Sequence, residues 1–236
     1  MKRNAPSQAA RAPFKKPRTT VKPKSQLQRR IDAVGAKPRM ATLPEVKNVD
    51  VSNAISIPSA TATFGTPVLL NGLDQGAGNS QRIGRRVILK SLLLRWSFSL
   101  PSATLANGQL GPVRILIYYD KNPDGLTPGI TDVLDNSSIN GLTNLGNSDR
   151  FIILRDFLID EKMGFRPDFG MAFNYCGKEF ITFGEGMEQQ FIGTGATIAS
   201  IGCGAIYLSY CTTAATINGG NFSRLDFQSR VRYIDP

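Results

Sequence analysis

The sequence predicts an all-β protein, an eight-stranded antiparallel jelly-roll sandwich that follows a disordered basic N-terminal arm. From residue 45 onward, several segments alternate apolar and polar residues in the period of two that is typical of half-buried strands. Long connections rich in Gly, Asn, Asp and Pro separate these segments, and the body has no strong helical period. Basic residues are concentrated at the N-terminal end. We therefore expect an arm over residues 1–40 and one folded domain over residues 41–236.

The arm is defined by its charge. Residues 1–40 hold 12 Lys or Arg and one acid, Asp32, whereas the other 196 residues hold 16 basic and 17 acidic groups. The arm contains five prolines and too few apolar side chains to fold alone. Such cations would neutralise phosphates without reading a base sequence. The candidate nucleic-acid-binding residues of the arm are Lys2, Arg3, Arg11, Lys15, Lys16, Arg18, Lys22, Lys24, Arg29, Arg30, Lys37 and Arg39.

Two shorter features lie within the arm. Its one aromatic residue, Phe14, cannot make a ladder of stacked bases, so we do not expect the arm to recognise bases by stacking. The segment SQLQRRIDAV (25–34) either forms a short helix that begins with a capping box or remains a disordered spacer. A candidate nuclear-import signal is formed by Lys15, Lys16, Pro17 and Arg18.

The first half of the body contains one long predicted strand, VILKSLLLRWSFSL (87–100), after weaker candidates at 46–57 and 63–71. Simple alternation through the long strand places Val87 and Leu89 on the face opposite to the main apolar set. That main set consists of Ile88, Leu92, Leu94, Trp96, Phe98 and Leu100. The next strand, PVRILIYYD (112–120), is expected to place Val113, Ile115, Ile117 and Tyr119 together.

The second half begins with the longest connection, residues 122–149, where TDVLDN (131–136) is expected to form one helical turn. Long connections often carry function. The run RFIILRDFL (150–158) is nearly all apolar, so we expect a strand that is covered on both sides. Two further strands are expected at 204–212 and 225–233, and two weaker ones at 173–183 and 188–193. The uncharged stretch 191–211 is long enough for a membrane span, but its glycines and hydroxyl groups favour a loop and a buried strand.

The residues that could serve as nucleophiles, acids, bases or metal ligands give no indication of catalysis. Histidine is absent, which excludes Ser-His-Asp and Cys-His nucleophiles and the usual zinc sites. The three cysteines, Cys176, Cys203 and Cys211, show no metal-binding spacing, and we expect them to be reduced and mostly buried. The acidic cluster of Asp156, Asp160 and Glu161 is expected to be solvated or paired with a neighbouring cation. We therefore predict no enzymatic activity and no cofactor.

The segment DKNPDG (120–125) resembles the opening of a calcium loop, with Asp120, Asn122 and Asp124 as weak candidate ligands. The twelfth position of such a loop would be a bidentate Glu, and here it is Thr131. Pro-Asp-Gly after a strand is also a strong turn signal. We favour the turn and predict no metal site.

Four further cations, Arg82, Arg85, Arg86 and Lys90, lie within nine residues at the start of the long strand. They form either a solvated edge or a basic surface that contacts nucleic acid beneath the arm. The sequence leaves both interpretations open.

Four segments resemble a known family. They are LDQGAGNSQRIGRRVILKSLLLRWSF (73–98), VRILIYYDKNPDG (113–125), NSDRFIILRDF (147–157) and SRVRYID (229–235). Their order and spacing after a basic arm resemble the capsid proteins of small circular single-stranded DNA viruses that encode a replication initiator. They also resemble the related capsids of satellite necrosis viruses, which package RNA. The arm differs from circovirus-type arms, which are dense in arginine, because it mixes lysine and proline.

The resemblance implies an eight-stranded jelly roll that assembles with its own copies into a T=1 icosahedral shell of about 60 subunits. It also implies that the arm lies inside, against single-stranded DNA. Host import machinery is an expected partner, and the virion and the host nucleus are the expected locations. We expect no membrane insertion. The alternatives are a satellite-like shell that packages single-stranded RNA and a cellular nucleic-acid-binding β-domain.

Overall fold

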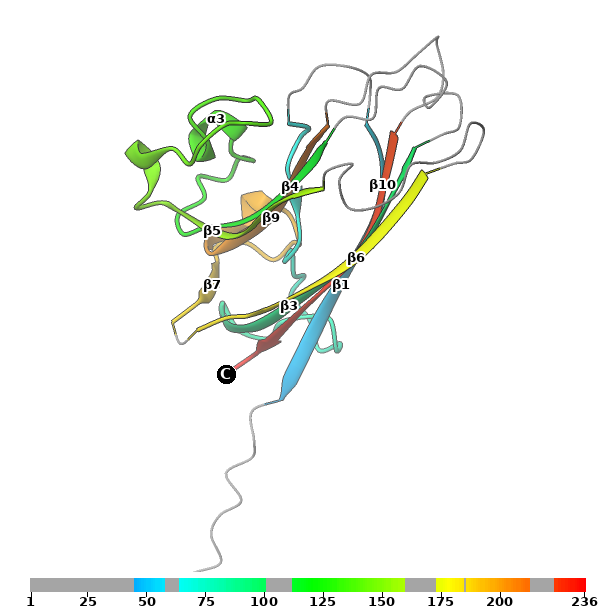
Figure 1. Ribbon diagram of the computed structural model, residues 1–236. Helices are drawn as coiled ribbons and strands as arrows, with labels where there is room; N and C mark the ends of the chain where they lie inside the picture. The colour runs from blue at the N-terminus through cyan, green and yellow to red at the C-terminus, as the bar shows by residue number, and fades with distance from the viewer. Residues whose placement is uncertain (1–44, 58–63, 101–111, 160–172, 185, 213–222) are drawn as a thin grey trace, which may run out of the picture. The chain divides into compact units, whose positions relative to one another are not determined.

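The computed structural model describes residues 45–57, 64–100, 112–159, 173–184, 186–212 and 223–236 (Figure 1). All of these residues belong to one compact unit, Pro44–Pro236. The predicted arm, with its import signal and its possible short helix, lies outside the described residues, as do Asp160 and Glu161. The predicted boundary at residue 40 therefore stays a prediction.

The described residues form two antiparallel sheets (Figure 1). In the larger sheet, β10 pairs with β1 on one side and with β3 on the other, and β6 and β7 pair with successive parts of the other edge of β3. β8 extends this sheet by pairing with β7. The strands of the larger sheet are β1 (Val46–Ile57), β10 (Ser223–Ile234), β3 (Arg86–Leu100), β6 (Phe173–Thr182), β7 (Glu188–Phe191) and β8 (Ile201–Cys203).

The smaller sheet has the order β2-β9-β4-β5. Its strands are β2 (Val68–Leu69), β9 (Ala205–Thr212), β4 (Val113–Asp120) and β5 (Phe151–Ile159). The short helical elements are α3 (Ile130–Val133), η1 (Leu145–Asn147) and η3 (Ile198–Ser200). Along the chain, β1, β3, β6 and β10 alternate with β2, β4–β5 and β9 of the opposite sheet, which is the jelly-roll order.

The predicted fold class is thus confirmed, whereas the number of strands differs in detail. The described residues form ten strands rather than eight, because β6 and β7 share one edge of β3 and β8 was not predicted. The predicted turn at 131–136 corresponds to α3. The weak candidate at 63–71 is a strand over Val68–Leu69 alone.

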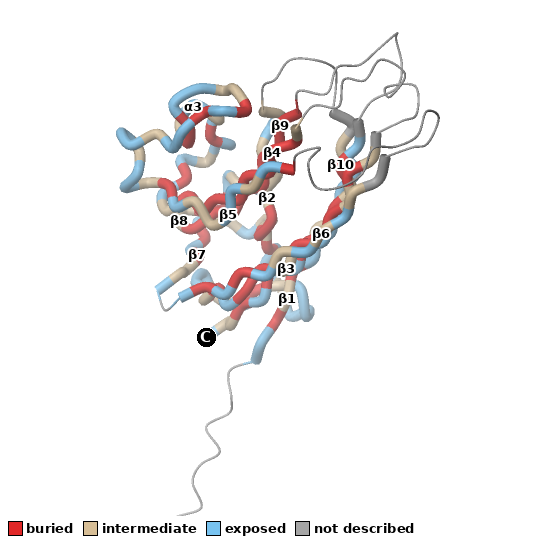
Figure 2. Tube along the Cα trace, in the orientation of Figure 1, coloured by how far each residue is buried: buried red, intermediate tan, exposed pale blue. Residues whose placement is uncertain are grey.

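The core lies between the two sheets, where the inward side chains of β3 and β10 are buried (Figure 2). Trp96 packs its ring against Phe157 and Tyr175, with ring centroids 5.7 and 5.4 Å away. Gly177 of β6 lies directly opposite Trp96, and a Cβ atom at this position would be 2.3 Å from the indole. This close approach requires glycine at residue 177.

The predicted facing of β3 is wrong at its beginning. The pairing of β10 with β3 shifts between Arg232 and Tyr233, so that Lys90 is an extra residue in β3. A β-bulge of this kind reverses the faces on which later side chains lie. Val87 and Leu89 are therefore buried with the main apolar set, while Ile88 is only partly buried.

Two other expectations about burial change because of strand position. All eight residues of β4 are buried, although alternation predicted one apolar face, because β4 is a central strand and its outer face is covered. β5 was expected to be covered on both sides. It is an edge strand of the smaller sheet, and its Ile152 and Leu158 are exposed.

The uncharged stretch 191–211 is a loop, the short elements η3 and β8, and the buried strand β9. This confirms the preferred interpretation of that stretch. Among the helices of the described residues, none has the length and apolar character that a membrane crossing needs.

The C-terminal end of β10 is fixed by a buried carboxylate. Asp235 pairs with the buried Lys47 at 3.2 Å and accepts hydrogen bonds from the backbone N–H of Ile83 and Gly84, at 2.6 and 3.3 Å. Burial raises the pKa of Asp235, but these hydrogen bonds and the Lys47 charge together outweigh it and hold the pKa below 3.8. The pair joins β1, β10 and the β2–β3 connection.

Candidate nucleic-acid interface

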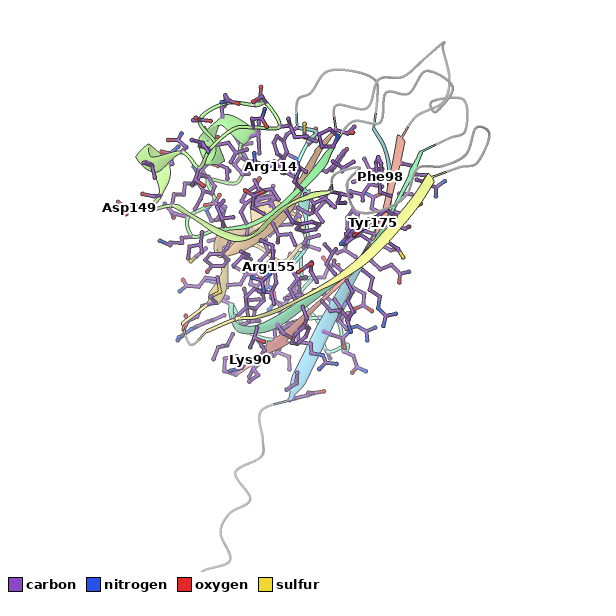
Figure 3. The ribbon with its side chains drawn as sticks, in the orientation of Figure 1. Lys90, Phe98, Arg114, Asp149, Arg155 and Tyr175 are labelled. Atoms are coloured by element: carbon purple, nitrogen blue, oxygen red, sulfur yellow. The ribbon has the colours of Figure 1, made fainter. Side chains whose placement is uncertain are left out.

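The β4–β5 connection (121–150) covers the outer face of the smaller sheet and is held there by Arg114. Arg114 lies on the outer face of β4, is 8% exposed, and donates to the carbonyl oxygens of Ile139 and Gly141, both at 2.7 Å. Its Nε and Nη2 donate to the two carboxylate oxygens of Asp156 on β5, at 2.8 and 2.6 Å. These bonds raise the pKa of Arg114. The expected pairing of Asp156 with a neighbouring cation is confirmed, and Figure 3 labels its partner Arg114.

A second arginine, Arg150, joins the two ends of the β4–β5 connection. It lies at the DKNPDG segment, where the sequence analysis considered a calcium site. The Asp120 carboxylate is fully buried and accepts from Arg150 Nε at 2.9 Å and from Nη2 at 2.8 Å. It also accepts from the backbone N–H of Asn122 at 3.0 Å. Asp124 lies 3.7 Å from the same guanidinium. The cation beside Asp120 and Asp124, two of the three candidate ligands, is thus Arg150.

The turn that follows β4 has the expected chemistry. Gly125 has a φ of 81°, in the left-handed region that favours glycine. The structure therefore supports the turn interpretation of DKNPDG. Among the described residues, no group of three or more His, Cys, Asp or Glu could hold a metal ion.

The surface of the β4–β5 connection is apolar and acidic. Three leucines, Leu126, Leu142 and Leu145, are 70%, 71% and 82% exposed. The connection, residues 121–150, contains four acids and two bases, and Asp149 lies on its exposed part (Figure 3). Several exposed leucines on one segment are typical of a surface that contacts another protein.

Arg82, the first residue of the predicted basic cluster, does not lie at the surface. Its side chain is fully buried, donates to the carbonyl oxygens of Gly84 and Gly193, and stacks on Phe191 with 3.9 Å between guanidinium and ring centroid. Burial lowers its pKa below the usual value. Arg82 therefore joins the β2–β3 connection to the β7–β8 region and is withdrawn from the proposed phosphate contacts.

The other three residues of the cluster are exposed but not equivalent. Arg86 is paired with Glu188 on β7, and this pairing raises the pKa of Arg86. Arg85 and Lys90 have no ion-pair partner among the described residues, and Lys90 projects at the bulge of β3 (Figure 3). The structure thus leaves two of the four predicted cations free to meet an anion.

A further set of cations lies on the outer face of the larger sheet and was not predicted as a site. On this face, Arg230 is paired with Asp50 and Arg224 with Asp226. Three exposed cations of the same face, Arg95, Lys178 and Arg232, form no ion pair with another described residue. The pairing of β3 with β6 places Arg95 directly opposite Lys178, and the pairing of β3 with β10 places Arg232 opposite Ser91, farther along the same face.

The cysteines differ in exposure. Cys211 is buried, which raises the pKa of its thiol to about 11, and burial also raises the pKa of the partly buried Cys203. Cys176 is exposed on β6, contrary to the expectation that the cysteines are mostly buried. All three are free thiols.

The chain was compared with known proteins. One relative is the capsid protein of Miscanthus streak virus (isolate 91), which is 29% identical over an alignment of 166 residues; the match covers 62% of this chain and 63% of the relative. The match thus spans less than two thirds of the relative's length.

Two solved structures also match. Desmodium yellow mottle tymovirus is 12% identical over 84% of this chain and 92% of its own, with a TM-score of 0.30. An Israeli acute paralysis virus particle is 10% identical over 94% of this chain and 83% of its own, with a TM-score of 0.29. At such low TM-scores, the fold assignment depends on the strand order itself.

A comparison with models of protein families gives a match over almost the whole chain. The model of the geminivirus coat protein/nuclear export factor BR1 family matches residues 2–234, which include both the basic arm and the jelly-roll body. The chain therefore belongs to the geminivirus coat protein/nuclear export factor BR1 family.

Proposed function

We propose that this protein is the capsid protein of a small single-stranded DNA virus. In this proposal, it assembles into a T=1 icosahedral shell of about 60 copies and packages DNA through residues 1–40. The observation that carries the proposal is the separation of charge, with twelve cations and one acid in the arm and a body that is nearly neutral. The jelly-roll body and the family of the chain support it.

In this proposal, the arm binds nucleic acid and the body forms the contacts between subunits. A concentrated cationic segment binds nucleic acid by releasing the counterions of the phosphates, without regard to sequence. A nearly neutral body lets subunits meet laterally without strong repulsion. The exposed leucines of the β4–β5 connection supply apolar surface for such contacts. Arg85 and Lys90 are proposed as additional phosphate contacts on the body, and Arg86 as a weaker one because Glu188 already pairs with it.

We also propose that the protein enters the host nucleus before it becomes part of the virion. The segment formed by Lys15, Lys16, Pro17 and Arg18 would bind host import machinery. Replacing its three cations with alanine should leave a fluorescent fusion protein in the cytoplasm. Nuclear accumulation equal to that of the unmodified fusion would contradict this role.

The experiment that tests the main proposal is expression of the full chain, followed by electron microscopy and measurement of particle mass. We expect closed shells that contain nucleic acid sensitive to DNase. Nucleic acid sensitive only to RNase would favour the satellite-like alternative. Small species alone, with or without nucleic acid, would favour an export factor or a cellular binding module and refute the capsid assignment.

Deletion of residues 1–40 separates packaging from folding. The truncated protein should retain its far-ultraviolet β-sheet spectrum but lose most of its salt-dependent affinity for nucleic acid. An unchanged affinity would contradict the proposal that the arm carries packaging. In that case the exposed cations of the body would carry it.

A further inference from the structure

The two outer faces of the sandwich differ in what covers them. The β4–β5 connection lies over the smaller sheet, where the outward residues Leu116, Tyr118 and Asp120 are buried. On the larger sheet, the outward residues of β3, β6 and β10 are exposed or only partly buried over most of their length (Figure 2). No described segment covers this open face.

Like charges face each other on this open surface. Arg95 of β3 lies directly opposite Lys178 of β6 in the antiparallel register, so their Cβ atoms are about 5 Å apart. Both side chains are exposed, and neither forms an ion pair with a described residue. Like charges in this position destabilise a sheet. An anion between the two side chains would remove that repulsion.

An exposed aromatic ring lies next to the charge pair. Phe180 is two residues after Lys178 on the same face of β6 and is 54% exposed. Its partner across the strand pair is the partly buried Leu93. An exposed phenylalanine beside cations on a sheet face is an arrangement on which single-stranded nucleic acids stack their bases. The arm has no equivalent, since Phe14 is its one aromatic residue.

Two grooves extend from Arg95 across the sheet toward β1. One has a volume of about 590 Å³ and is lined by polar groups that include Ser52, Ser97 and Gln228. The other, of about 320 Å³, is lined by Arg95 together with the Arg230–Asp50 pair. The larger groove also contains Asp226, whose carboxylate is paired with Arg224 at 2.8 Å. The charge that remains on this face is therefore positive.

We infer that the outer face of the larger sheet is a second, arm-independent binding surface for single-stranded nucleic acid, with Phe180 stacking on a base and Arg95 and Lys178 contacting phosphates. Arg232 extends the positive surface along β10, where it lies opposite Ser91 of β3. The inference rests on the proposed packaging function and adds to it a place where bases, not only phosphates, are contacted. Charge selects the occupant, because the arm is itself strongly cationic and would be repelled.

The affinity for a single-stranded oligonucleotide and the salt dependence of that affinity distinguish base stacking from phosphate contacts. Full-length protein, dissociated into subunits and freed of nucleic acid, is titrated with a labelled oligothymidylate at several salt concentrations. Phe180→Leu should weaken binding roughly 5- to 150-fold at constant salt slope, since a stacked base is lost and no phosphate contact. The double variant Arg95→Gln, Lys178→Gln should reduce the slope of log K against log salt by about 1.4, since each single-strand phosphate contact contributes about 0.7.

A matched control removes the same charge elsewhere. Lys121 and Arg155 belong to the other sheet and its connection, and Lys121→Gln, Arg155→Gln should leave the slope nearly unchanged. Equal slopes for the two double variants would overturn the inference, because the effect would then be one of net charge. Circular dichroism and thermal unfolding confirm that each variant is folded.

Cys176 allows the same test on the unmodified chain, so that the outcome does not depend on a variant folding. It is exposed on the open face of β6, opposite Ser97, whereas Cys203 and Cys211 are partly or fully buried. Saturating oligothymidylate should slow the reaction of Cys176 with a thiol reagent severalfold, with Cys176→Ser identifying the signal. A protein that does not bind the oligonucleotide at all refutes the proposed function. A protein that binds it while Cys176 stays fully reactive refutes this inference alone.

Discussion

The Asp120–Arg150 ion pair should be far more important to stability than its geometry alone suggests. Asp120 is fully buried, and both of its oxygens accept from the guanidinium, at 2.9 and 2.8 Å. Replacing Arg150 with Met leaves this carboxylate in the protein interior with the Asn122 N–H as its one hydrogen-bond donor among the described residues. Removing one partner of a buried pair typically costs about 3–5 kcal/mol. We expect a loss of unfolding free energy in that range for Arg150→Met.

A second ion pair provides the control, because it has the same geometry at a different depth. Arg230 donates to the two oxygens of Asp50 at 2.7 and 2.6 Å, but the two side chains are 48% and 50% exposed. Exposed pairs contribute about 0–1 kcal/mol. Arg230→Met should therefore cost less than about 1 kcal/mol. The contrast between the two variants isolates burial from hydrogen-bond geometry.

The assay is equilibrium unfolding of dissociated subunits in urea at neutral pH, with hydrogen exchange to locate the change. Arg150→Met should lose exchange protection across residues 121–150, because Arg150 joins the two ends of that connection. The double variant Asp120→Leu, Arg150→Met should recover much of the loss, since no charge is then buried without a partner. Equal costs for Arg150→Met and Arg230→Met would refute the reasoning, as would a double variant less stable than Arg150→Met.

Three further predictions concern other parts of the fold. The pKa of Asp235 is held below its ordinary 3.8, so its contribution to stability is present above that pH and is lost as the pH falls further. The difference in unfolding free energy between wild type and Asp235→Asn should shrink between about pH 6 and pH 3. Gly177→Ala should cost about 1–3 kcal/mol in urea unfolding, because its methyl group meets the Trp96 ring, and a neutral effect would contradict this contact. Replacing the exposed Leu142 and Leu145 with Asp should change unfolding by about 0.5 kcal/mol or less but prevent shell formation in electron microscopy.

The parts of the fold that depend on local pattern could be predicted from the sequence. The alternation in β10 and the predicted range of β1 match the structure, because both strands have one face toward the core and one toward solvent. Alternation failed where a strand departs from that condition. The outer face of β4 is buried by a connection that follows the strand in the chain, and β3 contains a bulge at Lys90. Nothing in the residues of these strands alone indicates either event.

The candidate site, like the fold, could be predicted from the sequence only in part. Net charge predicts an arm, and this stays a prediction, but exposure could not be inferred for individual cations of the body. Arg82 and Arg85 are three residues apart, and the first is buried on Phe191 while the second is exposed. Lys178 became relevant only through its position opposite Arg95, which depends on the pairing of two strands far apart in the sequence. Sequence could identify the charges but not their neighbours.

The charges of the nearly neutral body are also unevenly distributed, in addition to the difference in charge between the arm and the body. Residues 121–150, which cover the smaller sheet, contain four acids and two bases. The outer face of the larger sheet contains Arg95, Lys178 and Arg232 without described ion-pair partners. Such an uneven distribution favours heterologous contacts, in which an acidic part of one copy meets a basic part of the next. Nucleic acid bound to the open face would compete for those same cations. Shell assembly and packaging should therefore respond to salt together, even in a protein without its arm.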